Sequence, residues 1–168
     1  MNRIEVGFLE DHEIDALITL AQKIWYATYP GLIPEAQIRY MLNQRYAPDV
    51  LRQQRSQGHP VLVARATTEL VGFAHVLVEG HQSRLDKLYV DPGLQGHGVG
   101  RLLVAHATEY ALAKGCSIMT LRVNRNNSRA IQAYHRYGFD VVATRREDIG
   151  GGFIMDDLIF LRELPCSY

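Results

Sequence analysis

The residues best suited to chemistry form a glycine-rich segment at residues 95–100, which reads Gln-Gly-His-Gly-Val-Gly. A strand-like stretch precedes this segment, and a helix-like amphipathic stretch follows it directly. Glycine at positions 96, 98 and 100 allows positive φ and close approach of the backbone to a ligand. Successive backbone N–H groups at the positive end of a helix favour an anion. The segment therefore predicts a phosphate or pyrophosphate site.

The spacing of these glycines narrows the class of ligand. A nucleoside-triphosphate loop would need Lys and Ser or Thr after its last glycine, but Arg101 and Leu102 follow Gly100. A dinucleotide loop, Gly-x-Gly-x-x-Gly, would need a third glycine where Arg101 stands, counting from Gly96 and Gly98. Both of these nucleotide-binding classes are disfavoured.

A second informative segment covers residues 123–139. Asn127 or Ser128 can cap a helix, and Gly138 can end it. Apolar and aromatic residues at helical spacing place Tyr134 on the face that would be buried. Taken alone, this pattern favours a core role for Tyr134.

Together the two segments resemble the signatures of the GNAT superfamily of N-acetyltransferases. The loop fits Gln/Arg-x-x-Gly-x-Gly/Ala at Gln95, Gly98 and Gly100. The second segment fits Asn-x-x-Ala-x-x-x-Tyr-x-x-x-Gly-Phe from Asn127 to Phe139. The order of the two segments and the helix and strand between them also agree, and the resemblance covers roughly residues 61–164.

This resemblance implies a single α/β GNAT domain over residues 1–168, with a mixed, mostly antiparallel sheet of about seven strands flanked by helices. It implies acetyl-CoA as co-substrate, with its pantetheine arm between strands that splay apart at residues 84–90 and 118–123. Such a splay leaves backbone groups to be satisfied by the ligand. The cofactor-binding residues implied by the resemblance are Leu88, Tyr89, Val90, Gln95, Gly96, His97, Gly98, Val99, Gly100, Arg101, Asn127 and Tyr134.

The implied reaction is direct attack of a neutral amine on the thioester, without an acylated enzyme. The Val90 N–H is then the natural donor to the oxyanion, and Tyr134 the acid that protonates the leaving thiolate. Asp86 is our candidate base, because it shares a strand face with Leu88 and Val90. His75 and Glu79 are rival bases, and a merely structural role for each of these side chains stays open.

The acceptor side is expected to involve the N-terminal helices and the last hairpin. Trp25, Tyr26 and Tyr29 could wall an amine site, since aromatic faces attract cations, although Trp25 also fits a core position. Asp156 and Asp157 are adjacent on a late strand, so at most one of them would face the amine. A looser resemblance to spermidine/spermine-type acetyltransferases makes a small amine or polyamine the first candidate acceptor.

Other acceptors and other classes of protein stay open at this point. Aminoglycosides, amino acids and protein N-termini are alternative acceptors. A CoA-binding module without transfer activity and a phosphate-binding protein of another kind are alternatives to an enzyme. A homodimer is also left open by the sequence.

The elements expected to position these residues alternate between strand-like and helix-like stretches. Asp11 is expected to cap the first helix, Pro34 to begin the second and Gly115 to end the fourth. Strands are expected at residues 4–9, 61–66, 70–79, 84–90, 118–123, 141–148 and 153–161, and helices at 12–27, 34–44, 48–57, 99–114 and 128–137.

Composition sets the outer bounds of this interpretation. The 168 residues are 47% hydrophobic and 21% charged, which is typical of one globular domain. Eighteen basic and eighteen acidic side chains balance, which argues against a general nucleic-acid binder. Cys116 and Cys166 show neither disulfide nor metal-ligand spacing. The absence of a signal-like or membrane-spanning stretch predicts a cytoplasmic protein.

Overall fold

A computed structural model describes residues 3–165 of the chain. Cys116 is a buried free cysteine, and Cys166 lies outside the described residues. In chain order the elements are β1 (Ile4–Phe8), the 3-10 turn η1 (Asp11–Glu13), α1 (Ile14–Thr28), α2 (Glu35–Arg45), α3 (Pro48–Ser56), β2 (Val61–Ala66), β3 (Glu69–Glu79), β4 (Gln82–Val90), the 3-10 turn η2 (Pro92–Leu94), α4 (Val99–Ala113), β5 (Ile118–Asn124), α5 (Ser128–Arg136), β6 (Asp140–Gly150) and β7 (Phe153–Glu163).

Each expected strand and helix has a counterpart, with ends that differ by at most two residues. The prediction that Asp11 caps the first helix is wrong, because Asp11 lies inside η1 and its carboxylate pairs with Arg55. The N-cap of η1 is Glu10, one residue before Asp11, and its N–H donates to the Glu13 carboxylate at 2.9 Å. Pro34 is the N-cap of α2 and not its first residue, so α2 begins one position later than expected.

The chain divides into two compact units. The first comprises Met1–Val76 and Lys87–Ala107, and the second comprises Leu77–Asp86 and Thr108–Tyr168. The boundaries fall inside β3, β4 and α4, so each of these elements contributes to both units. The expectation of a single domain stays a prediction.

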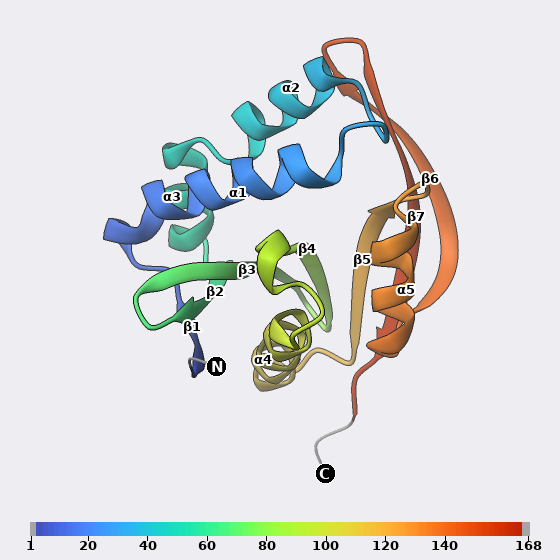
Figure 1. Cartoon of the computed structure of the whole chain (residues 1–168). Coiled ribbons are helices and arrows are strands. Elements are labelled where there is room, and N and C mark those ends of the chain that lie inside the picture. The colour runs from blue at the N-terminus through green and yellow to red at the C-terminus, as the bar shows by residue number, and fades with distance from the viewer. Residues whose placement is uncertain (1–2, 166–168) are drawn as a thin grey trace. The chain divides into compact units, whose positions relative to one another are not determined.

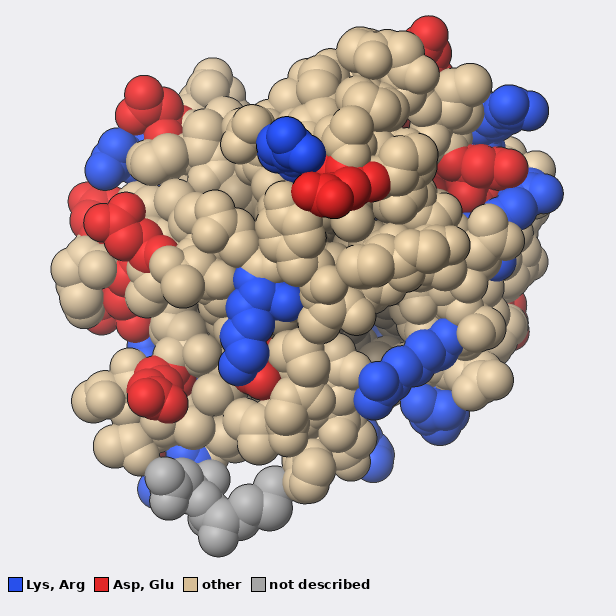
Figure 2. All heavy atoms as spheres, turned by 45° about the horizontal axis from the view of Figure 1, so that its top comes forward, with Lys and Arg blue, Asp and Glu red and all other residues tan. Residues whose placement is uncertain are grey.

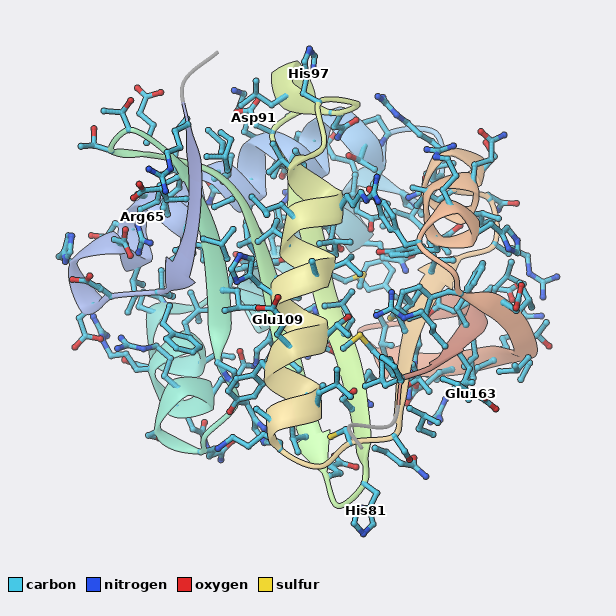
Figure 3. The ribbon with its side chains drawn as sticks, turned by 90° about the horizontal axis from the view of Figure 1, so that it is seen from below. Arg65, His81, Asp91, His97, Glu109 and Glu163 are labelled. Carbon is cyan, nitrogen blue, oxygen red and sulfur yellow. The ribbon has the colours of Figure 1, made fainter. Side chains whose placement is uncertain are left out.

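In the first unit, helices cover strands β1, β2 and β3. Antiparallel ladders join β1 to β2 and β2 to β3. In Figure 1, α1, α2 and α3 lie on one side of these strands, and Figures 1 and 3 show the beginning of α4 on the other side. Helix α1 buries a stripe at helical spacing, which anchors it to the sheet. This stripe is formed by Ile14, Leu17, Leu20, Ala21, Ile24 and Trp25.

In the second unit, β7 lies between β5 and β6 and pairs antiparallel with both. The start of β4 pairs parallel with β5, from Gln82 opposite Ile118 to Leu85 opposite Leu121, where the ladder ends although both strands continue. Of the two candidate caps of α5, Asn127 is the one that caps it, since its side chain accepts from the Ala130 N–H at 3.2 Å.

Strand neighbours follow the order β1-β2-β3-β4-β5-β7-β6 in a seven-stranded sheet. One parallel ladder among antiparallel ones makes the sheet mixed and mostly antiparallel, as predicted. None of the helices within residues 3–165 is long and apolar enough to cross a membrane. Basic and acidic side chains are interspersed over the face of the molecule that Figure 2 shows.

Candidate active site

The glycine loop, residues 95–100, has the predicted positive φ at Gly96 and Gly98, whereas Gly100 lies inside α4 without positive φ. It follows η2, and α4 begins at Val99, where the Gly98 carbonyl accepts from the Leu102 N–H at 3.0 Å. Gly96 and Gly98 have φ of +84° and +86°, which side chains rarely tolerate. A β-carbon at either position would meet nothing within 4 Å. Glycine is therefore needed for its φ, and the space beside the backbone is open.

The stretch before the glycine loop is fastened to α1. The Asp91 carboxylate accepts from Lys23 Nζ at 2.6 Å and from the Gly93 N–H at 2.9 Å. Burial alone would raise the pKa of Asp91, but the hydrogen bonds from Lys23 and Gly93 outweigh it and lower this pKa. Asp91 is thus held as an anion at the entrance to the loop, where Figure 3 shows it with His97 at the N-terminal end of α4.

The end of β4 is held by two further hydrogen bonds. Gln95 Nε2 donates to the Val90 carbonyl at 3.1 Å, and the Asp91 N–H donates to the Val71 carbonyl at 2.8 Å. The Gln95 side chain therefore turns back to the strand. Because Gln95 already occupies the Val90 carbonyl, the predicted main-chain contact of Val90 with the pantetheine arm is expected to use the Val90 N–H.

The three candidate bases lie in different surroundings. Asp86, in the second unit, has a side chain 22% exposed, with Oδ1 3.5 Å from Arg84 Nε. His75, in the first unit, is completely buried, and its Nδ1 lies 3.3 Å from Lys87 Nζ. Glu79 is exposed at the end of β3. Asp86 is the candidate that is partly buried and still reachable from solvent.

The ring of Tyr134 packs against three other aromatic rings. Tyr134 is 9% exposed, and the ring centroids of Phe139 and Phe160 lie 6.1 Å and 5.9 Å from its own, with Tyr137 at 6.4 Å. The core role inferred from the helical spacing is therefore correct for the ring. The acid role assigned to the hydroxyl stays a prediction, as does the contact of Asn127 with the CoA arm.

A family model described as "Acetyltransferase (GNAT) family" matches residues 16–139, well over half of the chain. The chain belongs to the GNAT acetyltransferase family. It is an N-acetyltransferase that uses acetyl-CoA, as the two signature segments predict.

Known acetyltransferases match either nearly the whole chain or part of it. Spermidine N(1)-acetyltransferase of Thermoplasma acidophilum is 28% identical over 158 residues, which cover 91% of this chain and 96% of the relative. Streptothricin acetyltransferase of Streptomyces lavendulae is 40% identical over 76 residues, which cover 44% of this chain and 40% of the relative. The crystal structure of PaiA N-acetyltransferase from Thermoplasma acidophilum in complex with coenzyme A superposes with a TM-score of 0.84 at 28% identity, covering 96% of this chain and 99% of that one.

Of the three aromatic residues predicted for the acceptor side of this GNAT enzyme, Trp25 and Tyr29 are in ring contact, with centroids 4.6 Å apart, whereas Tyr26 is exposed. Trp25 is 1% exposed and donates from Nε1 to the Tyr46 hydroxyl at 3.3 Å, so it belongs to the core. Tyr26 is 44% exposed. The Tyr29 hydroxyl lies 3.0 Å from the Tyr89 hydroxyl, which ties the end of α1 to β4. A continuous aromatic wall of all three residues is therefore not formed.

The paired acids of β7 also separate, as adjacent strand residues must. Asp157 is 3% exposed. Asp156 has a side chain 40% exposed and accepts from Arg125 Nε at 2.9 Å. Of the two, Asp156 is the one that a soluble amine can reach.

Two polar features of this GNAT chain were missed by the sequence reasoning. The Lys23–Asp91 ion pair joins residues 68 positions apart and has no periodic signal. Lys87 is 3% exposed, with its Nζ 5.6 Å from the Tyr46 ring centroid. The alternation of β4 could have indicated this burial, because Lys87 shares its strand face with Leu85 and Tyr89.

Proposed function

We propose that this enzyme transfers the acetyl group of acetyl-CoA to a primary amine of a small polyamine, such as spermidine, in the cytoplasm. The observation that carries this proposal is the match to a spermidine N(1)-acetyltransferase along nearly the full length of both chains. The match leaves less than a tenth of this chain uncovered. The shorter streptothricin match leaves more than half of the chain uncovered.

In the proposed reaction the neutral amine attacks the carbonyl carbon of the thioester, and a C–N bond forms. The negative charge that develops on the oxygen is stabilised by the Val90 N–H. The C–S bond then breaks, and the thiolate takes a proton from the Tyr134 hydroxyl. Asp86, directly or through water, accepts the proton that the ammonium form of the amine must lose. The attacking nitrogen loses a second proton as the amide forms, and this proton restores the neutral Tyr134 hydroxyl through water. Asp86 returns its own proton to solvent, so the products are an N-acetyl amine, free CoA and one proton.

Two partly exposed carboxylates favour a cationic acceptor. Asp86 and Asp156 each have an arginine beside them, Arg84 and Arg125, at 3.5 Å and 2.9 Å. A cationic amine must therefore compete with an arginine at either carboxylate. We expect a polycation to do so better than a monocation, and we expect salt to weaken the preference because exposed charges are screened.

An acceptor panel tests the proposal. Thiol release from acetyl-CoA would be measured with spermidine, spermine, a streptothricin and neutral-side-chain amino acids, at low and high salt. We expect the polyamines to react fastest and to lose their advantage in high salt. Equal rates across polyamines and amino acids, without a salt effect, would contradict the polyamine assignment and leave the acetyltransferase assignment intact.

A streptothricin-type amine is the second candidate acceptor, supported by the higher identity of that partial match. Faster reaction with the streptothricin than with either polyamine would favour it. Stabilisation by CoA without thiol release for any amine would instead indicate a CoA-binding module without transfer activity.

A further inference from the structure

The two peptide groups that flank Val90 are held from outside β4. On the C-terminal side, the Val90 carbonyl accepts from Gln95 Nε2 at 3.1 Å, and the following Asp91 N–H donates to the Val71 carbonyl at 2.8 Å. One bond comes from the glycine loop and the other from β3. Because a hydrogen bond fixes each end of this peptide group, it has little freedom to rotate about the strand axis.

On the N-terminal side, the peptide group is held by lack of space. A β-carbon at Gly72 of β3 would lie 3.0 Å from the Tyr89 carbonyl oxygen, and 3.1 Å and 3.3 Å from side-chain carbons of Leu103 and Val99. Gly72 does not have a positive φ, so glycine is required here for space and not for conformation. β4 and the first turns of α4 therefore lie so close to residue 72 that any side chain larger than that of glycine would displace them.

The Tyr89 carbonyl and the Val90 N–H belong to the same peptide group. This group is planar and trans, so any shift of the oxygen also turns the N–H. A methyl group at Gly72 would press on a backbone oxygen, which cannot move aside as the end of a flexible side chain can. The direction of the Val90 N–H is thus set by the absence of a side chain on the neighbouring strand.

We infer that Gly72 and Gln95 are positioning residues that aim the Val90 N–H at the oxyanion, an inference that rests on the proposed role of Val90. An oxyanion donor is effective only within about 2.7–3.1 Å of the oxygen in the transition state. Gly72 sets the peptide group before Val90, and Gln95 sets the one after it. Gln95 would then act through Val90 and not only as part of the phosphate loop.

Gly72→Ala tests the first half of this inference. We expect kcat to fall by about 10-fold, because a misplacement of about 1 Å can cost about 100-fold and the neighbours of Gly72 must move by a few tenths of an ångström. The Kd of acetyl-CoA should stay within about twofold. Gly7→Ala in β1 is the matched control, since a β-carbon there meets only the terminal Nη1 of the Arg65 side chain, at 2.9 Å. It should leave kcat unchanged.

The carbonyl stretch of bound [1-13C]acetyl-CoA supplies a readout that a purely structural role would not move. Polarisation by the Val90 N–H should lower this frequency in the wild-type complex, and Gly72→Ala should return it toward the value in water. An unshifted wild-type frequency together with normal turnover would contradict the role of Val90. A normal frequency and normal kcat in Gly72→Ala would contradict the positioning role of Gly72 alone.

Gln95 is tested by a pair of substitutions, which also serve if Gly72→Ala does not fold. Gln95→Glu keeps the shape but replaces the donor with an acceptor that repels the Val90 carbonyl, so kcat should fall by about 10-fold or more. Gln95→Arg restores a donor and should recover most of that loss. A rise in the Kd of acetyl-CoA with unchanged kcat in Gln95→Glu would overturn the inference, because it would assign Gln95 to phosphate binding.

Discussion

The glycine loop and the Tyr134 segment of α5 differ in which atoms carry their proposed chemistry. In the loop, backbone N–H groups are proposed to bind the phosphate, and the sequence contributes mainly by omitting side chains at φ of +84° and +86°. In α5, the proposed acid is the single hydroxyl of Tyr134, on a ring that packs against Phe139 and Phe160. Adding a side chain to the glycine loop should therefore abolish ligand binding. Removing the Tyr134 hydroxyl should lower turnover without loss of structure.

Gly98→Val should produce the largest effect. At φ of +86° a β-branched residue is strained, so the loop must rearrange or carry a side chain where the phosphate would lie. We expect the rise in Tm caused by saturating CoA or acetyl-CoA to disappear. Gly58→Val is a matched control, since Gly58 also has positive φ, +76°, and open space around its β-position. Both variants should lose similar stability, and only Gly98→Val should lose the ligand response; a folded Gly98→Val protein that still binds CoA would refute the assignment of the loop.

Tyr134→Phe should produce the next largest effect, and on turnover alone. The ring remains, so packing against Phe139 and Phe160 should be retained. Loss of the proton donor should lower kcat by about 100- to 10,000-fold, with the Kd of acetyl-CoA and the Tm nearly unchanged. Tyr137→Phe removes the same atom from the neighbouring ring and should retain normal kcat. Wild-type kcat in Tyr134→Phe would end the general-acid assignment.

Asp156→Asn should have a smaller effect, limited to cationic acceptors. An exposed ion pair is worth about 0.2–1 kcal/mol, so the KM for spermidine should rise by roughly two- to fivefold at low salt. The KM for a neutral amino acid should not change. Asp140→Asn, which removes an exposed charge from β6 of the same hairpin, serves as the control. If both variants raise the KM equally, the effect comes from net charge and not from a contact with the acceptor.

Lys23→Gln should have the smallest effect, and it should be visible in stability. The lowered pKa of Asp91 means that the unfolded chain binds a proton more readily than the folded one. The resulting stabilisation is present above the unfolded pKa of about 3.9 and is lost as the pH falls through the lower folded value. Because Lys23 is 61% exposed, its share should be only about 0.5 kcal/mol.

Thermal unfolding between pH 2 and pH 7 measures this effect. Lys23→Gln should lower Tm by about 1–2 °C at neutral pH and flatten the decline in acid. Lys114→Gln is the control, because Lys114 faces the Tyr110 ring and not a carboxylate. Equal pH profiles for Lys23→Gln and the wild type would contradict the proposed linkage.

Features that depend on neighbouring residues in the chain were predicted best from the sequence. Periodicity located the strands and helices, and the turn requirements of Gly96 and Gly98 located the loop. Asp11 was wrongly predicted as the cap because several neighbouring polar residues could cap this helix start. In the structure the Glu10 N–H donates to the Glu13 carboxylate instead. The Lys23–Asp91 pair, the bond from Gln95 to Val90 and the close approach at Gly72 arise from tertiary packing, which no local pattern encodes.

Trp25 gives this protein a built-in optical reporter. It is the only tryptophan in the sequence, it is 1% exposed, and its ring centroid lies 4.6 Å from that of Tyr29 and 5.9 Å from that of Tyr89. Emission excited at the red edge of the absorption band therefore comes from one fluorophore in an apolar setting, in ring contact with a residue of β4. A ligand that engages the main chain at Tyr89 should change the intensity or lifetime of this emission, so cofactor binding can be followed on the unlabelled protein.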